Sequence, residues 1–91
     1  MLYVVVYDIP DNKRRNKVAR ILEGYGSRVQ LSVFECDISD KLLAELKIKL
    51  RKKVKIEEDT VRFYVISHHT RGQVEVWNGP PVVQPAGSVV I

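Results

Sequence analysis

The chain of 91 residues contains one cysteine, two histidines and five glycines, and each of these low counts excludes a class of protein. Cys36 cannot form an internal disulfide, so a disulfide-stapled secreted domain is excluded and a reducing cytoplasm is the better match. The sequence has no glycine-rich phosphate loop, no cysteine and histidine spacing typical of a metal site, and no serine or cysteine nucleophile motif. Enzymes built on those motifs are therefore excluded.

Long hydrophobic runs are also missing. The first apolar run, residues 1–7, has no basic stretch before it. It is too short to span a bilayer and does not have the pattern of a secretory signal. We therefore expect a cytoplasmic protein without a membrane segment.

The charge and composition indicate a small folded protein with a preference for polyanions. Fifteen Lys and Arg residues against eleven Asp and Glu give a net charge of +4, and 45% of the residues are hydrophobic. This composition is typical of a globular chain, and the length suits one domain. A basic balance favours polyanionic partners. We expect one domain over residues 1–78 and a proline-rich tail over residues 79–91.

The first eight residues after Met1 predict a central strand. Residues 2–9 are β-branched or aromatic at both parities, as expected of a strand that is covered on both faces. Pro10 has no amide proton with which to continue a ladder, so Asp8 is expected at the carboxyl end of this strand.

The segment after Pro10 is predicted to be an amphipathic helix capped by Asp11 or Asn12. Its apolar stripe follows helical spacing and consists of Val18, Ile21, Leu22 and Tyr25. The opposite face is basic and carries Lys13, Lys17 and Arg20. Arg14 lies four residues before Val18, so we expect it on the inward side near the end of the first strand.

Residues 28–38 alternate without a turn signal, which favours one long strand bulged near residues 30–32, with two short strands as the alternative.

A second helix is expected after Ser39 or Asp40, with the stripe Leu43, Leu46, Leu50 and Val54. Between residues 47 and 55, six of nine positions are Lys or Arg. This run is either a solvated face or a phosphate contact surface.

The remaining sequence predicts strands at residues 60–67 and 73–77. The tail ends in the apolar residues 89–91, which we expect to pair as an edge strand. A second subunit is one candidate partner for this strand. Strands alternating with two helices indicate an α+β sandwich of the ferredoxin-like kind, with an antiparallel sheet and both helices on one face. Valine, tyrosine and isoleucine at the second parity of the first strand are unsuited to water. A homodimer packed sheet to sheet would cover them.

Asp8 is the main candidate for chemistry, because a strand end is a rigid mount and a carboxylate can bind magnesium while leaving water positions open. One carboxylate is not a site. Two subunits about a twofold axis would each supply Asp8, and the pair could hold a metal that activates water against a phosphodiester. Alternatively, Asp8 only accepts hydrogen bonds from the turn at residues 10–13.

Other polar residues have simpler interpretations. His68 and His69 follow a strand and are candidate acids or bases, but a surface position without a catalytic role is favoured. Glu35 and Asp37 share a parity and are candidate ligands, although solvent-facing strand residues need no special role. Trp77 is expected in the core or in an interface.

Three stretches resemble the CRISPR-associated protein 2 family. They are Tyr7-Asp8 at the end of the first strand, Arg14-Arg15-Asn16-Lys17-Val18 in the first helix, and the run from Tyr25 to Glu35, Tyr-Gly-Ser-Arg-Val-Gln-Leu-Ser-Val-Phe-Glu. The third stretch is the most specific. The resemblance covers about the first forty residues as motif and the rest as length and pattern.

The resemblance implies a ferredoxin-like homodimer that bridges dimers of the integrase, CRISPR-associated protein 1, while double-stranded protospacer DNA lies across its basic surface. Some members of the family are metal-dependent endonucleases on RNA or double-stranded DNA. In this family Asp8 would be the magnesium ligand of each subunit, and the other catalytic-site positions correspond to Tyr7, Arg15, Arg28, Ser32 and Phe34. Lys17 stands where some relatives have arginine.

Two functions are therefore predicted. The first is a DNA-binding scaffold of the spacer-acquisition complex, with positive charge on both helices available to the phosphate backbone. The predicted nucleic-acid contacts are Arg14, Arg15, Lys17, Lys49, Lys52 and Lys53. The second is a magnesium-dependent nuclease that uses the Asp8 pair, with arginines stabilising charge on the phosphate.

Overall fold

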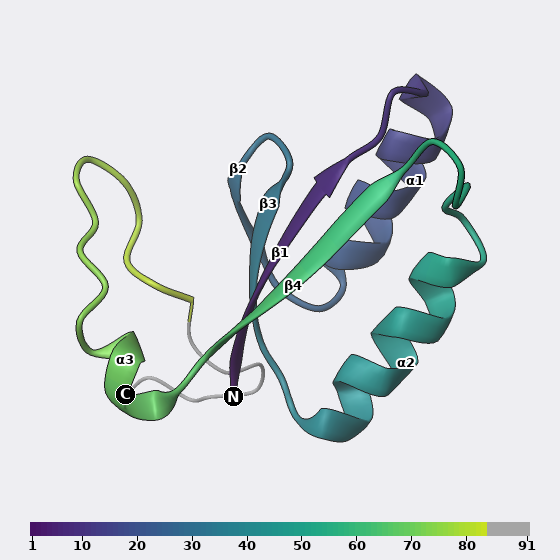
Figure 1. Ribbon diagram of the computed structural model, residues 1–91. Helices are drawn as coiled ribbons and strands as arrows, with labels where there is room; N and C mark the ends of the chain where they lie inside the picture. The colour runs from purple at the N-terminus through teal and green to yellow at the C-terminus, as the bar shows by residue number, and fades with distance from the viewer. Residues whose placement is uncertain (84–91) are drawn as a thin grey trace.

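The structure is a computed structural model, and residues 1–83 are described. The chain alternates strands and helices (Figure 1) in the order β1 Leu2–Asp8, α1 Asn12–Glu23, β2 Ser27–Gln30, β3 Val33–Asp37, α2 Asp40–Arg51, β4 Thr60–Ile66 and α3 His68–Arg71. Strands β1 and β4 and the two longer helices therefore lie where the sequence predicts them.

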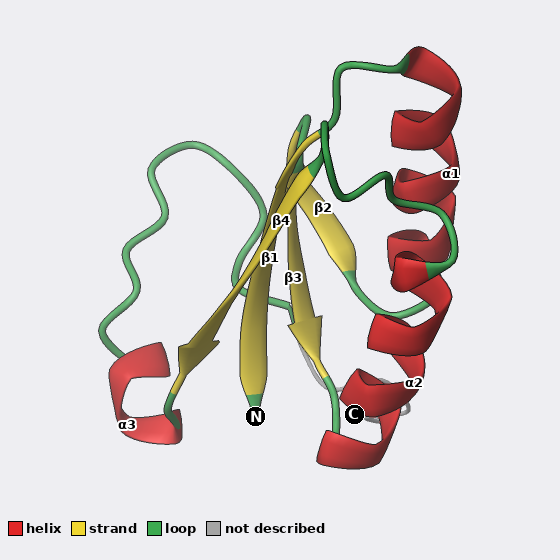
Figure 2. Ribbon diagram, turned by 45° about the vertical axis from the view of Figure 1, so that its right-hand side comes forward, coloured by secondary structure: helices red, strands yellow, loops and turns green. Residues whose placement is uncertain are grey.

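The four strands form one sheet in the order β2-β3-β1-β4, with every neighbouring pair antiparallel. Helices α1 and α2 pack on the same face of this sheet (Figure 2). This is the ferredoxin-like α+β sandwich that the sequence predicts. Because β1 is central, its carboxyl end lies between β3 and β4, so Asp8 is held at a rigid edge of the fold.

The core lies between the sheet and the two helices. Tyr3, Val5 and Tyr7 of β1 are buried there with residues of the predicted helical stripes, among them Val18, Leu22, Leu46 and Leu50. The opposite parity of β1, Leu2, Val4 and Val6, faces the other side of the sheet. The sequence predicted that the valine, tyrosine and isoleucine side chains of one parity of the predicted first strand would form a dimer face. This prediction is wrong, because these side chains lie in the core under the helices. Both parities are apolar, so the residues alone gave no sign of which one the helices cover.

Side-chain caps fix the start of each long helix. The carboxylate of Asp11 accepts a hydrogen bond from the Arg14 amide at 2.8 Å, and the Ser39 hydroxyl accepts one from the Leu42 amide at 3.2 Å. These contacts satisfy amides that a helix leaves free in its first turn. The Arg14 amide bond is the main cause that lowers the pKa of Asp11.

The predicted long strand at residues 28–38 is wrong, and its alternative of two short strands is confirmed. Strands β2 and β3 form a hairpin whose turn is Leu31-Ser32, with a register shift between Arg28 and Gln30. The hairpin is anchored to β1, because the Tyr7 amide donates to the Ser32 carbonyl at 3.1 Å. The turn contains no glycine, proline or asparagine, and Ser32 is only a weak turn former, so the stronger sequence signals were missing.

Gly26 lies where α1 leads into β2 and is pressed against β3. A Cβ atom at this position would lie 2.6 Å from the Cys36 sulfur and would also collide with the Glu35 backbone carbonyl. Cys36 is fully buried, and this burial raises the pKa of its thiol to about 11. The close approach therefore requires a residue without a side chain.

We expect Gly26→Ala to lower the free energy of unfolding by about 3 kcal/mol, because β3 must move away from the new methyl group. The matched control is Gly72→Ala, whose Cβ would lie an ordinary 3.6 Å from the His69 carbonyl oxygen; it should change stability by less than ~0.5 kcal/mol. Both values come from chemical denaturation followed by circular dichroism. Equal stability of the two variants would contradict the prediction.

The segment after β4 differs from the sequence prediction. Residues 73–77 form no strand, and a short helix, α3, precedes a loop that turns at Asn78, whose φ is 60°. Trp77 is 88% exposed, so its predicted packing in the core of this chain is wrong. The chain then returns to the sheet, where the Val83 amide donates to Glu35 at 3.1 Å.

The apolar residues 89–91 lie outside the described residues, so their predicted pairing as an edge strand stays a prediction. The same is true of the boundary between a domain over residues 1–78 and a tail. Within residues 1–83, no helix has the length and apolar character that a membrane crossing requires.

Candidate nucleic-acid and metal site at the end of β1

Asp8 ends β1 with an exposed carboxylate that projects from the sheet face opposite the helices. It shares this parity with Leu2, Val4 and Val6, and its backbone pairs with Thr60 at the start of β4. Among residues 1–83 no hydrogen bond or ion pair engages this carboxylate. The alternative that Asp8 caps the following turn is therefore wrong, since Asp11 performs that role.

A depression of about 500 Å³ surrounds Asp8 at this end of the sheet. Its walls come from the end of β1, the first turns of α1 and the β2–β3 hairpin, and its lining is Asp8, Ile9, Arg15, Asn16, Arg28, Leu31 and Ser32. Four of the predicted site residues, Asp8, Arg15, Arg28 and Ser32, thus meet in one pocket. Sequence analysis missed Ile9, Asn16 and Leu31, which carry no chemical signal of their own.

Tyr7 and Phe34 lie beneath the pocket. Both are buried, with ring centroids 6.3 Å apart and ring planes inclined by 29°. The Arg28 guanidinium lies 5.3 Å from the Phe34 centroid and 3.5 Å from the Tyr7 hydroxyl, which donates to the Leu31 carbonyl at 3.2 Å. The two aromatic residues therefore orient Arg28 and the hairpin turn, and they are not part of the pocket lining.

Arg15 closes the side of the pocket formed by the β1–α1 connection. Its guanidinium donates to the Ile9 carbonyl at 2.9 Å and also to the Asn12 side chain. These bonds hold the cation beside Asp8 while it remains partly exposed. Two arginines and a carboxylate that is unpaired within residues 1–83 line this pocket, which gives it the charges needed to bind a phosphate and a cation together.

The other predicted contacts lie outside the lining of this pocket. Lys17 is exposed on α1, and Lys52 and Lys53 are exposed where α2 ends. Lys49 lies 5.1 Å from the Tyr25 ring centroid and 3.3 Å from Glu45. Both contacts raise the pKa of Lys49, and Tyr25 has the larger effect. Lys49 is thus held in one place on α2, whereas the lysines after it extend into solvent.

Arg14 is directed away from the pocket. Its guanidinium donates to both carboxylate oxygens of Asp59, at 2.8 and 2.9 Å, and to Glu58 at 2.9 Å. This geometry raises the pKa of Arg14, mainly through Asp59, and the same bond lowers the pKa of Asp59. A phosphate would have to compete with two carboxylates for Arg14, so its predicted nucleic-acid contact stays a prediction.

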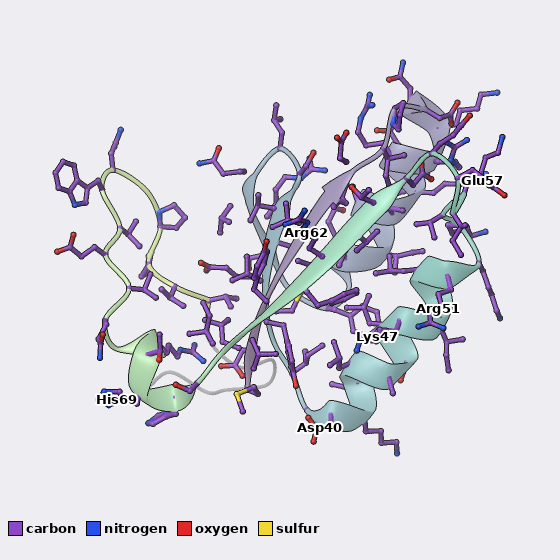
Figure 3. The ribbon with its side chains drawn as sticks, viewed as in Figure 1. Asp40, Lys47, Arg51, Glu57, Arg62 and His69 are labelled. Carbon is purple, nitrogen blue, oxygen red and sulfur yellow. The ribbon has the colours of Figure 1, made fainter. Side chains whose placement is uncertain are left out.

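The remaining candidates lie elsewhere. Figure 3 shows His69 at the opposite end of the molecule from Glu57, which lies in the loop that leads to the start of β4, where Thr60 pairs with Asp8. Glu35 accepts the Val83 amide, and Asp37 binds Arg71 and, at 3.5 Å, the terminal amine of Met1. Neither carboxylate is available as a ligand beside Asp8. In the described part of the chain, no group of three or more His, Cys, Asp or Glu residues is arranged to hold a metal.

The fold and this pocket define a small ferredoxin-like protein that presents one carboxylate and two arginines at the end of its first strand. The family model for CRISPR associated protein Cas2 matches residues 1–74. The chain belongs to the Cas2 family, as its sequence resemblance predicts.

Individual relatives agree with this assignment. The chain is 54% identical to the CRISPR-associated endoribonuclease Cas2 3 of Synechocystis sp., over 99% of this chain and 98% of that protein. It resembles the crystal structure of a hypothetical protein from Thermus thermophilus, with a TM-score of 0.79 and 44% identity over 91% of this chain and 96% of that one. It also resembles a chain of a partial Cas6-RT-Cas1–Cas2 complex, with a TM-score of 0.77 and 32% identity over 99% of this chain and 98% of that one.

Proposed function

We propose that this protein is a homodimeric scaffold of CRISPR spacer acquisition, which binds duplex DNA and bridges dimers of the Cas1 integrase. The observation that carries the proposal is the match, over 99% of this chain, to a chain of a complex that contains Cas1 and Cas2. Exposed lysines on both helices, together with the net charge of +4, suit a duplex backbone and no particular base sequence.

A second copy of the chain is part of this proposal. The sheet face opposite the helices carries Val4 and Val6, which are partly exposed, and on the neighbouring strand β4 the Tyr64 side chain is 49% exposed. Asp8 projects from the same face. A twofold axis through this face would cover the apolar strip and bring the two Asp8 carboxylates toward each other.

Integration of a short DNA duplex into a CRISPR-repeat substrate by purified Cas1 tests the scaffold. We expect integration to require this protein and to persist at half or more of its rate with Asp8→Asn, because the bridge depends on shape and charge. Integration at the same rate without the protein would contradict the proposal. Complete loss with Asp8→Asn would contradict a purely structural role.

A second function, magnesium-dependent cleavage of RNA or double-stranded DNA, is favoured by the exposed Asp8 carboxylate in a pocket that Arg15 and Arg28 also line. Magnesium keeps several water ligands and is held in proteins by one or two carboxylates, so two Asp8 side chains about a twofold axis suit it. The ion, when bound there, would supply an activated water. Arg15 and Arg28 would bind the phosphate and stabilise the charge that develops on it.

A further inference from the structure

An ion pair between the partly exposed Arg14 and the buried Asp59 connects two segments that are distant in sequence. The Asp59 side chain is fully buried, and its two oxygens accept three hydrogen bonds: two from the Arg14 guanidinium and one from the Lys55 amide at 2.8 Å. Removing charges from water costs energy that the attraction between them only partly offsets. An ion pair of this kind is therefore better explained by the geometry it imposes than by the stability it adds.

The pair closes the loop between α2 and β4, residues 52–59. Inside the loop, the amides of Glu58 and Asp59 donate to the Lys55 carbonyl at 3.0 and 2.8 Å, so the loop folds back on itself before Asp59. Figure 2 shows this loop running beside α1 from the end of α2 to the start of β4. The next residue, Thr60, pairs with Asp8.

The loop carries three exposed lysines. Lys52 and Lys53 make no ion pair within residues 1–83, and Lys55 lies 3.7 Å from Glu58. Lys55 is bound to Asp59 directly through its amide, whereas Lys52 and Lys53 follow the last turn of α2, at the other end of the loop that Asp59 closes. If Asp59 released the loop, the three lysines would be on a flexible connection, and binding DNA would require that connection to be ordered.

We propose that Asp59 is a positioning residue for nucleic-acid binding: through Arg14 it holds the lysine-bearing loop, residues 52–59, against the start of α1 in the arrangement that contacts phosphates. Arg14 thereby acts on DNA through the loop rather than as a phosphate ligand. The inference rests on the proposed function, since it concerns the surface that binds the duplex.

The sign of the effect separates this role from simple electrostatics. Asp59→Asn removes a negative charge, which by itself strengthens binding to a polyanion. If Asp59 positions the loop, the same substitution weakens binding. Glu58→Gln is the matched control, because Glu58 contacts the same guanidinium at 2.9 Å and loses the same charge, but its side chain is 48% exposed.

The experiment measures the affinity of the intact protein for a 30-base-pair duplex at several salt concentrations. We expect Asp59→Asn to lower the affinity about fivefold near 0.1 M salt and to reduce the slope of log affinity against log salt by about 2, as the loss of two phosphate contacts predicts. Glu58→Gln should bind at least as tightly as the unmodified protein. In a protein that already carries Lys52→Gln and Lys53→Gln, Asp59→Asn should lower the affinity further by less than about twofold. The phosphate contacts that Asp59 positions are already lost in that background.

Amide hydrogen exchange of the free protein reports on the loop without DNA. The amides of Lys55, Glu58 and Asp59 should exchange faster in Asp59→Asn and not in Glu58→Gln. If Asp59→Asn does not fold, Arg14→Lys replaces it, since lysine keeps the charge but cannot form the two-pronged contact. Unchanged or tighter binding by Asp59→Asn, or unchanged exchange, would overturn the inference alone. Failure of the unmodified protein to bind duplex DNA would overturn the proposed function and this inference with it.

Discussion

Asp8→Asn is expected to lower magnesium-dependent cleavage of RNA or duplex DNA by about 100-fold or more. Loss of a partner behind a metal ligand already costs on the order of 10- to 100-fold, so loss of the ligand itself should reach at least the upper end. Asparagine has nearly the same shape, and among residues 1–83 the Asp8 carboxylate has no partner to lose. Stability should therefore not fall, and DNA binding should be as tight or tighter, because the substitution removes a negative charge.

The measurement is a time course of cleavage with magnesium and with chelator. Glu57→Gln is the matched control, because Glu57 is an exposed carboxylate in the loop that leads to the start of β4, and it should cleave as the unmodified protein does. Cleavage that survives Asp8→Asn would remove Asp8 from the chemistry. Cleavage that survives the chelator would exclude the metal-dependent mechanism for this chain.

Reversing three charges at the end of α2, with Lys49→Glu, Lys52→Glu and Lys53→Glu together, is expected to weaken duplex binding on the order of 100-fold near 0.1 M salt. Each lost phosphate contact removes about 0.9 from the slope of log affinity against log salt, so the slope should fall by about 3. The loss should shrink as salt is raised, because screening weakens the interaction of the unmodified protein more.

Lys41→Glu is the control for this variant, since Lys41 is an exposed lysine in the first turn of the same helix, at its opposite end. Thermal unfolding of the triple variant must be compared as well, because Lys49 contacts Tyr25 and Glu45. An unchanged affinity in a folded triple variant would remove the end of α2 from the contact surface and confine the DNA to α1 and the pocket.

The sequence predicted some features of the candidate site and not others. The placement of Asp8 at a strand end followed from the apolar run before it and from Pro10 after it, which are local signals. The resemblance supplied Tyr7, Arg15, Arg28, Ser32 and Phe34 as a group. Only the structure separates the residues that line the pocket from Tyr7 and Phe34, which are buried below it.

Partners far apart in sequence could not be predicted. Arg14 was expected on the inward side of its helix, and it does point inward, but its partner Asp59 is 45 residues away and looked like one more acid in an acidic run. Trp77 was expected in the core or in an interface, and the structure excludes the core of this chain, because the side chain is 88% exposed. No local pattern specifies which distant segment a side chain meets, because that depends on how the finished elements are placed.

By itself the sequence determined the elements that rest on neighbouring residues: the helix periods, each helix start to within one residue, the end of β1, and hence the fold class. The tertiary structure alone decided which face of β1 the helices cover, where the β2–β3 hairpin turns, and which basic residues are bound by carboxylates and which remain exposed. The physical reason is the range of the interactions. Caps and periodicity act within one or two turns of chain, whereas faces, turns without glycine and partly buried ion pairs are fixed only when several elements pack together.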